Sequence, residues 1–370
     1  MRERATQRGT RAWAATEFLA ARMGLPSEAA TVEARRFHEF EHYGFSEIAR
    51  AFMRDAGIGA PADSRELFNR ALSTTDFPKL LSDVVNKTLE HAYRYAPGTF
   101  TVWTARDTAP NFRPVHIARI APPSELPELG ESGVYEYLDM EEGEELAQVR
   151  TFGGLLALTR QALINDDLGA LRKIGRALGM AAKMHQNRRV YKQLLGNPTL
   201  SDGTDVFHGD RGNLLTGAAS ALGRDSLALA VKTLRMMADG AGNPLSVEPR
   251  YLLVPPSLEI TAHELCFSES IPGQANSAVP NLFKKLGLVP QVESLLESPA
   301  LSGSSATAWY LMPDPNLWPV FSTITLGSED ALAPYVDSQP AWTSDGVEYK
   351  VRTDFDCCAV GCRAVKSAGQ

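Results

Sequence analysis

The longest helix of the chain is predicted for residues 165–195, NDDLGALRKIGRALGMAAKMHQNRRVYKQLL. Asn165, Asp166 and Asp167 are residue types that cap helix N-termini, and Gly196-Asn197-Pro198 is a typical helix end. At a rise of about 1.5 Å per residue, about thirty residues give a helix about 45 Å long. We expect its buried stripe to consist of Leu171, Ile174, Leu178 and Ala181.

The predicted helix is strongly basic. Residues 166–195 contain seven lysines and arginines against Asp166 and Asp167, which gives a charge of +5. At about 100° per residue, three of the bases fall within about 40° of one another and form one edge of the helix, called here the basic edge. It consists of Arg172, Arg176 and Lys183.

Residues 113–153, called here the acidic arm, have the opposite charge and no helical period. Three arginines stand against nine acidic residues, which gives −6. Val115–Ile120 alternates like a strand, and the middle of the segment is rich in proline and glycine. A loop of about forty residues without its own core is uncommon in a compact domain and indicates function or flexibility.

The opposite charges have two interpretations. Each charged set can simply face water, or the acidic arm of one copy can lie across the basic edge of the next. Such a contact repeats around a ring and builds closed assemblies, and strands of about twenty residues at about 3.3 Å each reach about 60 Å. The candidate contact residues are Glu136, Asp139, Glu141, Glu142, Glu144, Glu145, Arg172, Arg176 and Lys183.

The rest of the chain mixes helices and strands. Helices are expected in the first seventy residues and over 77–94, 225–238 and 257–266. Strands are expected over 99–103, 251–254, 308–312 and 347–353, and residues 267–308 are expected to be mostly loops.

Composition excludes several classes of protein. The 370 residues are 44% hydrophobic, too apolar for an intrinsically disordered chain. A net charge of −7 argues against a protein whose main function is to bind nucleic acid. There is no secretory signal and no apolar run of about eighteen residues, so we expect a soluble protein without a membrane span. The extreme N-terminus is nonetheless basic, with Arg2, Arg4, Arg8 and Arg11 as candidate residues facing DNA.

Enzyme sites have little support. His208-Gly209-Asp210 with Asn213 resembles a kinase-type catalytic string, but the asparagine is three residues after the aspartate instead of five. Asp354-Phe355-Asp356 lacks the glycine of the metal-binding Asp-Phe-Gly, and no glycine-rich phosphate loop precedes either string. We therefore expect a polar turn, and keep a phosphotransferase built on Asp210 as a remote alternative.

The four cysteines do not predict a disulfide framework. Three of them crowd together at Cys357, Cys358 and Cys362, and structural zinc needs two spaced pairs or a fourth ligand nearby. We expect the cysteines to pack as small apolar residues in a protein of a reducing compartment. We expect no metal and no cofactor.

A set of segments in fixed order resembles tailed-phage major capsid proteins of the Mu-type head-subunit group, many of which are encoded behind a prohead protease. The segments are STTDFPKLLSDVVNKTL (73–89), LTRQALINDDLG (158–169), GNPTLSDG (196–203), FHGDRGNL (207–214), YLLVPPSLE (251–259), SATAWYL (305–311) and DGVEYKVR (345–352).

The resemblance implies an α+β fold of the Hong Kong 97 type. In that fold an N-terminal arm, an extended E-loop, a peripheral domain with a long spine helix and an axial domain are expected. The implied segments are a helical N-terminal extension (1–69), the arm and entry to the peripheral domain (70–112), the E-loop (113–153), the peripheral domain with the spine helix (154–200), the axial domain (201–330) and a return strand (331–370).

The resemblance also implies a non-enzymatic function. The chain is expected to assemble into hexamers and pentamers of an icosahedral head that encloses double-stranded DNA, after assembly in the bacterial host cytoplasm. Further implied partners are a portal and decoration or scaffolding proteins. Some relatives join subunits through an E-loop lysine, but no lysine occurs in 113–153, so assembly is expected to be non-covalent. An encapsulin-like shell with enzyme cargo is the alternative.

Overall fold

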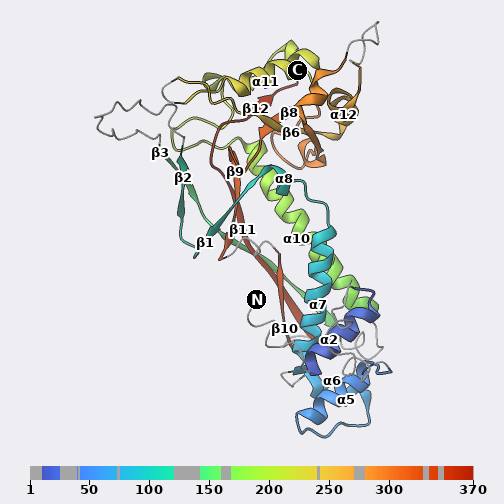
Figure 1. Cartoon of the computed structure of the whole chain (residues 1–370). Helices are drawn as coiled ribbons and strands as arrows, with labels where there is room; N and C mark the ends of the chain where they lie inside the picture. The colour runs from blue at the N-terminus through green and yellow to red at the C-terminus, as the bar shows by residue number, and fades with distance from the viewer. Residues whose placement is uncertain are drawn as a thin grey trace, which may run out of the picture. The chain divides into compact units, whose positions relative to one another are not determined.

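The computed structural model describes residues 11–25, 40, 42–72, 76–120, 142–159, 168–239, 242–270, 280–327, 333–340 and 346–369. The chain forms two compact units. Unit 1 comprises Met1–Pro97, Thr151–His185 and Asp330–Asp354, and unit 2 comprises Gly98–Arg150, Gln186–Glu329 and Phe355–Gln370. Each unit is therefore built from segments that are far apart in the sequence (Figure 1).

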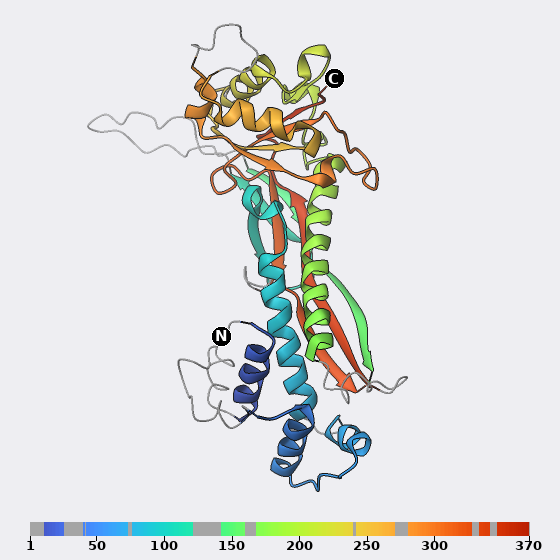
Figure 2. The same cartoon turned by 90° about the vertical axis from the view of Figure 1, so that its right-hand side faces the viewer.

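Unit 1 begins with the helices α2 (Arg11–Arg22), α5 (Phe45–Asp55), α6 (Ser64–Leu72) and α7 (Asp76–Tyr95). They confirm the helical prediction for the described part of this region and the helix predicted over 77–94. Helix α2 lies along α7 (Figure 2), and buried Phe18, Leu81 and Leu89 belong to their shared core. Lys87 of α7 forms an ion pair with Glu17 of α2, whose side chain is 1% exposed.

The long predicted helix is confirmed as α10 (Leu168–Gly196), of which the residues up to His185 belong to unit 1. Its predicted buried stripe is partly wrong, because Ala181 is exposed. The side chain of Leu171 lies outside the described residues, and Ile174 and Leu178 are only half-buried in the core.

Helix α10 lies beside α7 (Figures 1 and 2), and two of its glycines, Gly175 and Gly179, lie close to α7. A Cβ atom on Gly179 would lie 2.5 Å from the carbonyl oxygen of Leu89, and one on Gly175 would lie 2.7 Å from the Cβ of Thr88. A side chain at either position has no room without movement of the helix backbones, so glycine sets the separation of the two helices.

The sheet of unit 1 contains β10 (Tyr335–Pro340), the first part of β11 (Gly346–Ala359) and β4 (Arg150–Thr159). β10 and β11 are antiparallel, and β4 also pairs with β11. The predicted alternation along 347–353 is confirmed: Tyr349 is buried and Lys350 is exposed. Helix α7 packs on β10 and joins it through Asn86, whose side chain bonds both the N–H and the carbonyl of Val336 at 2.8 and 2.9 Å.

Unit 2 contains a sheet of order β5-β12-β8-β6-β7. Its strands are Leu214–Leu215, Val365–Ser367, Trp309–Pro313, Pro249–Val254 and Val289–Val292. The predicted strand 308–312 is confirmed as the central β8, with Trp309 fully buried. Helices α11 (Arg224–Arg235) and α12 (Glu259–Phe267) confirm two predicted helices and pack against this sheet (Figure 1). Short 3-10 turns at Gly209–Arg211, Ala218–Ser220, Pro256–Leu258, Leu282–Leu286 and Ser294–Leu296 connect the elements.

The strand predicted over 99–103 is wrong, because Phe100–Trp103 forms the short helix α8. In a helix, Phe100 and Trp103 lie on the same face, whereas a strand would point them to opposite sides. Both rings are buried, against Phe355 and Tyr191 respectively. Tertiary packing therefore overrides the local alternation.

After α8, strand β1 (Ala105–Ala109) pairs in parallel with β9 (Phe321–Leu326), which also pairs with the end of β11. The two strands of the acidic arm follow. β2 (Val115–Ile120) and β3 (Glu142–Ala147) are antiparallel, with Val115 opposite Ala147 and Ile120 opposite Glu142. The strand prediction for 115–120 is confirmed, and residues 121–141 lie outside the described residues. The base of the arm packs around a small core, which consists of Ala109, Ala147, Val149 and Ile324.

Candidate functional site

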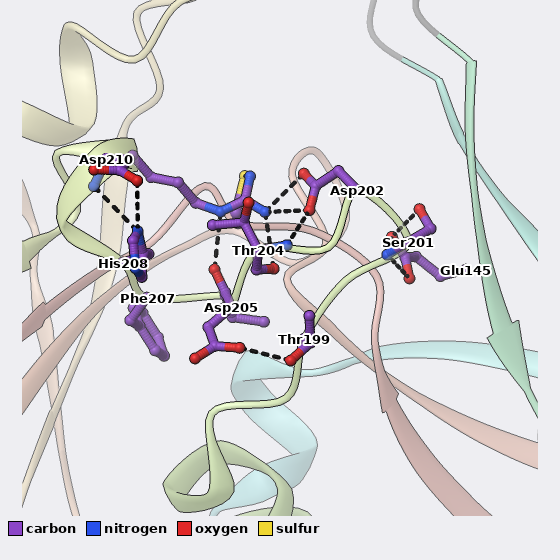
Figure 3. A network of polar contacts seen from close by, with 12 residues as sticks. Glu145, Thr199, Ser201, Asp202, Thr204, Asp205, Phe207, His208 and Asp210 are labelled. Atoms are coloured by element: carbon purple, nitrogen blue, oxygen red, sulfur yellow. Dashed lines mark hydrogen bonds and ion pairs between the residues drawn. The ribbon is translucent and has the colours of Figure 1, made fainter.

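The base of the acidic arm is tied to the loop that follows α10 by a network of polar contacts (Figure 3). Glu145 of β3 is 6% exposed. Its two carboxylate oxygens each lie 3.1 Å from the backbone nitrogen of Ser201, and the Ser201 hydroxyl donates to one of them at 2.8 Å. One carboxylate thus holds strand β3 in place.

Arg211 organises the next part of the same loop. Its Nη2 donates to both carboxylate oxygens of Asp202, at 2.6 and 2.7 Å, and to the carbonyl of Thr204 at 3.0 Å. Its Nε donates to the carbonyl of Asp205 at 2.8 Å. Burial alone lowers the pKa of Arg211, but the contacts with Asp202 and Cys362 outweigh it and raise the pKa. The guanidinium is therefore a permanent charged cross-link within the loop.

The His208-Gly209-Asp210 string forms a structural turn. Residues Gly209–Arg211 are a 3-10 turn capped by His208, whose Nδ1 accepts from the backbone N–H of Asp210 at 3.2 Å. The Asp210 side chain is 90% exposed. Asn213 is fully buried: it accepts from the N–H of His208 at 2.9 Å and donates to the carbonyls of Val206 and Cys362 at 2.7 and 3.0 Å.

These contacts do not form a catalytic arrangement around Asp210. A hollow of about 720 Å³ in unit 2 is lined by residues such as Arg106, Trp318 and Arg363, and Asp210 is not part of it. The geometry of the string supports the predicted polar turn and gives the phosphotransferase alternative no support.

The Asp354-Phe355-Asp356 string is also structural. Asp354 accepts from the hydroxyl of Thr151 at 2.6 Å. In unit 2, Asp356 is 6% exposed and accepts from Nε and Nη2 of Arg189 at 2.8 and 3.1 Å. Among the described residues, no three or more His, Cys, Asp or Glu side chains are grouped so as to hold a metal ion.

The four cysteines are free thiols. Burial raises the pKa of Cys266 to about 11, and burial together with neighbouring charged groups raises that of Cys357 well above its ordinary value. Both are 2% exposed. These thiols stay protonated near neutral pH and act as small apolar groups in the packing.

The structure places the candidate contact residues in different environments. Glu144 is exposed and pairs with His116 at 2.9 Å, whereas Glu145 is buried against Ser201. Glu142 lies in β3, and Glu136, Asp139 and Glu141 lie outside the described residues.

On α10, Arg172 and Arg176 are exposed as the basic edge requires. Lys183 is half-buried, with its Nζ 4.8 Å from the centre of the Tyr93 ring. Of the N-terminal arginines, Arg11 begins α2, and Arg2, Arg4 and Arg8 lie outside the described residues. Reasoning from the sequence missed Ser201, because one serine in a polar loop carries no signal.

Several of the polar side chains singled out from the sequence bond other parts of the same chain, and Glu144 of β3 with Arg172 and Arg176 of α10 remain exposed. Such contacts stabilise the fold and assign no chemical reaction to these side chains. The chain matches the family model described as phage capsid protein over residues 142–364, and it belongs to that family. Its members are structural proteins of the virion capsid. Membership, together with the arm, the long helix and the mixed sheets, confirms the predicted α+β fold of the Hong Kong 97 type.

Three similar solved structures share little sequence identity with this chain. The capsid of Ralstonia phage GP4 has 11% identity over 72% of this chain and 86% of its own, with a TM-score of 0.49. The procapsid of bacteriophage JBD30 has 14% identity over 80% and 76%, with 0.45. The virus-like particle from Pyrococcus furiosus has 11% identity over 76% and 97%, with 0.45. A comparison with curated protein sequences found no match. None of the described helices is long and apolar enough to cross a membrane.

Proposed function

We propose that the chain is a major capsid protein of the Mu-type head-subunit group, which assembles non-covalently into hexamers and pentamers of an icosahedral tailed-phage head around double-stranded DNA. It performs no chemical conversion. Membership of the phage capsid protein family is the observation that carries this proposal. The six segments expected from the sequence, from the N-terminal extension to the return strand, are part of the same proposal.

In the proposed contact, the acidic arm of one copy lies across the basic edge of the next. Residues 121–141 contain no lysine or arginine, and their acidic residues include Glu136, Asp139 and Glu141. Exposed Arg172 and Arg176 on α10 offer the opposite charge. Glu145 has a different role, since its carboxylate holds the base of the arm, and Lys183 contributes less because Tyr93 partly covers it.

Assembly from many such contacts needs no single tight site, because an interface repeated in every copy multiplies a modest free energy. Partners beyond the chain itself are proposed to be a portal, decoration or scaffolding proteins and packaged DNA. Arg2, Arg4, Arg8 and Arg11 are proposed to face that DNA, since phosphate contacts need only positive charge. Deleting residues 2–11 is then expected to change DNA retention in filled heads.

Electron microscopy and gel filtration of the purified chain at increasing concentration test the proposal. Capsomers or closed shells without ATP turnover are the expected result. A chain that stays monomeric at every concentration and salt, or that hydrolyses ATP, contradicts it. Shells that contain a protein cargo and no portal would favour the encapsulin-like alternative.

A further inference from the structure

The hollow of about 720 Å³ in unit 2 lies against the edge of a sheet. Strand β1 is the first in the order β1-β9-β11-β10, so among the described strands it pairs with β9 alone. Arg106 and Asp107 of β1 line the hollow, and Ile117 of β2 lines it from another strand. An edge strand presents unpaired N–H and C=O groups. The hollow therefore adjoins backbone groups with which an extended chain can pair.

The hollow is positively charged. Its charged lining residues are Arg106, Asp107 and Arg363. Arg106 is exposed and forms no ion pair with any residue that the structure describes. The guanidinium carbon of Arg363 lies 4.9 Å from the centre of the Trp318 ring, an arrangement that restricts this group. The carboxylate of Asp107 accepts a hydrogen bond from the buried hydroxyl of Ser322 on β9. Two arginines against one bonded carboxylate favour an anionic occupant.

Apolar side chains are exposed in the same lining. Leu317 is 73% exposed and Val102 is 39% exposed, and both line the hollow together with Trp318. Large exposed apolar side chains mark interaction sites, and Trp and Arg are the residue types that dominate the binding energy of protein interfaces. A small-molecule site encloses most of its ligand, whereas Leu317 projects largely into solvent. The lining thus fits a segment of a longer chain better than a small molecule.

We propose that this hollow binds an acidic, extended peptide segment of a partner protein, which adds a strand to the edge of β1. In strand addition, backbone hydrogen bonds supply affinity and side-chain contacts supply specificity. Successive side chains of a strand point to opposite sides, so acidic groups meet Arg106 and Arg363 while the apolar groups between them cover Leu317. The acidic arm of the chain itself is already assigned to the basic edge of α10, so the occupant is a different protein. The inference rests on the proposed function, because it names the chemistry by which a shell subunit holds a decoration or scaffolding partner.

Binding of a defined probe to the full chain tests the proposal. The probe is a short fluorescent peptide that alternates glutamate and leucine, and its matched control alternates lysine and leucine. We expect fluorescence anisotropy to give the first peptide a Kd below about 1 mM, and the second a Kd at least about tenfold higher. Amide hydrogen exchange in Ala105–Ala109 is expected to slow when the first peptide is bound. Weaker binding than this, equal binding of both peptides, or unchanged exchange overturns the proposal.

Single substitutions locate the binding. Arg106→Gln removes an exposed charge and Leu317→Gln removes an exposed apolar group, and each is expected to weaken binding of the acidic peptide about fivefold. Salt should reduce the effect of Arg106→Gln and leave that of Leu317→Gln, because only the charge is screened. The matched controls are Arg235→Gln and Leu229→Gln, exposed residues of α11 outside the hollow, which should bind like wild type. Equal affinity of wild type and both hollow variants overturns the proposal.

Assembly separates this inference from the proposed function. Arg106→Gln/Leu317→Gln is expected to assemble like wild type, because the occupant of the hollow is not a copy of the chain. If this variant is folded and fails to assemble while wild type forms shells, the hollow is a contact between copies and the proposal is overturned. Peptide binding is measured separately, on the unassembled chain. Wild type that assembles without binding the peptide overturns the proposal alone, and wild type that binds the peptide without ever assembling overturns the proposed function.

Discussion

Glu145 accepts hydrogen bonds from both the backbone nitrogen and the hydroxyl of Ser201, at 3.1 and 2.8 Å. One buried carboxylate therefore joins the acidic arm to the loop that follows α10. Glu144, the preceding residue of β3, points outward to His116. Glu144 and Glu145 thus have different roles, because successive side chains of a strand face opposite sides. The inner one fixes the base of the arm and the outer one meets solvent.

The first prediction concerns Glu145→Ala. It removes the buried carboxylate that accepts from the N–H and hydroxyl of Ser201, and because Ser201 itself is exposed and can bond water, we expect a cost of about 1–2 kcal/mol in the free energy of unfolding. Urea unfolding measures the loss, and amide hydrogen exchange is expected to rise in β2 and β3. Glu144→Ala is the control and should stay within about 0.5 kcal/mol of wild type. Equal losses in the two variants would contradict a role for the buried contact.

The second prediction concerns the close approach of α7 and α10. Gly179→Ala places a Cβ atom 2.5 Å from the carbonyl oxygen of Leu89, so the helices must move apart. Overpacking of this kind costs about 1–3 kcal/mol and lowers the melting temperature. In Gly196→Ala the new Cβ meets no atom within 4 Å, and the melting temperature should hardly change. If Gly179→Ala melts like Gly196→Ala, the helices are not held at this separation.

These two sites show what the sequence could and could not reveal. The periodicity and caps of 165–195 located α10 to within a few residues, and alternation located β2 and β11, since local pattern decides such elements. The contact face of α10 was missed, because Gly175 and Gly179 have no side chain to contribute to an apolar stripe. The separate role of Glu145 in an acidic run was equally invisible, since it depends on Ser201, 56 residues away in the sequence.

The third prediction concerns the ion pair between Lys87 of α7 and Glu17 of α2. Glu17 is 1% exposed, so Lys87→Met leaves a buried carboxylate without its lysine. Breaking a fully buried pair costs about 3–5 kcal/mol, and because Lys87 is 31% exposed we expect about 2–3 kcal/mol. Urea unfolding of Lys87→Met and of Glu17→Met/Lys87→Met measures the effect. The double variant should recover most of the loss, and a neutral Lys87→Met would show that the pair contributes little.

The fourth prediction concerns alkaline pH. Burial raises the pKa of Cys266 from 9.0 to about 11, so above pH 9 the unfolded chain loses this thiol proton before the folded chain does. The stability supplied by the protonated thiol is complete below about pH 9 and is lost as the pH rises toward 11. Urea midpoints measured from pH 7 to 11 should fall more steeply for wild type than for Cys266→Ala. At pH 8 the thiol should also resist a disulfide reagent until the chain unfolds; rapid native labelling would contradict its burial.

The fifth prediction concerns the proposed contact between the acidic arm of one copy and the basic edge of the next. Arg172→Glu/Arg176→Glu reverses the basic edge, and Glu136→Lys/Asp139→Lys/Glu141→Lys reverses the acidic arm. Each variant alone should fail to assemble at low salt, because like charges then face each other across the contact. A chain that carries all five changes restores opposite charges and should assemble again. Light scattering at increasing salt concentration measures the extent of assembly. The differences in assembly between wild type and the variants should shrink once the screening length falls below about 10 Å. If circular dichroism shows that the five-change chain is folded and it still does not assemble, the two charged surfaces do not meet.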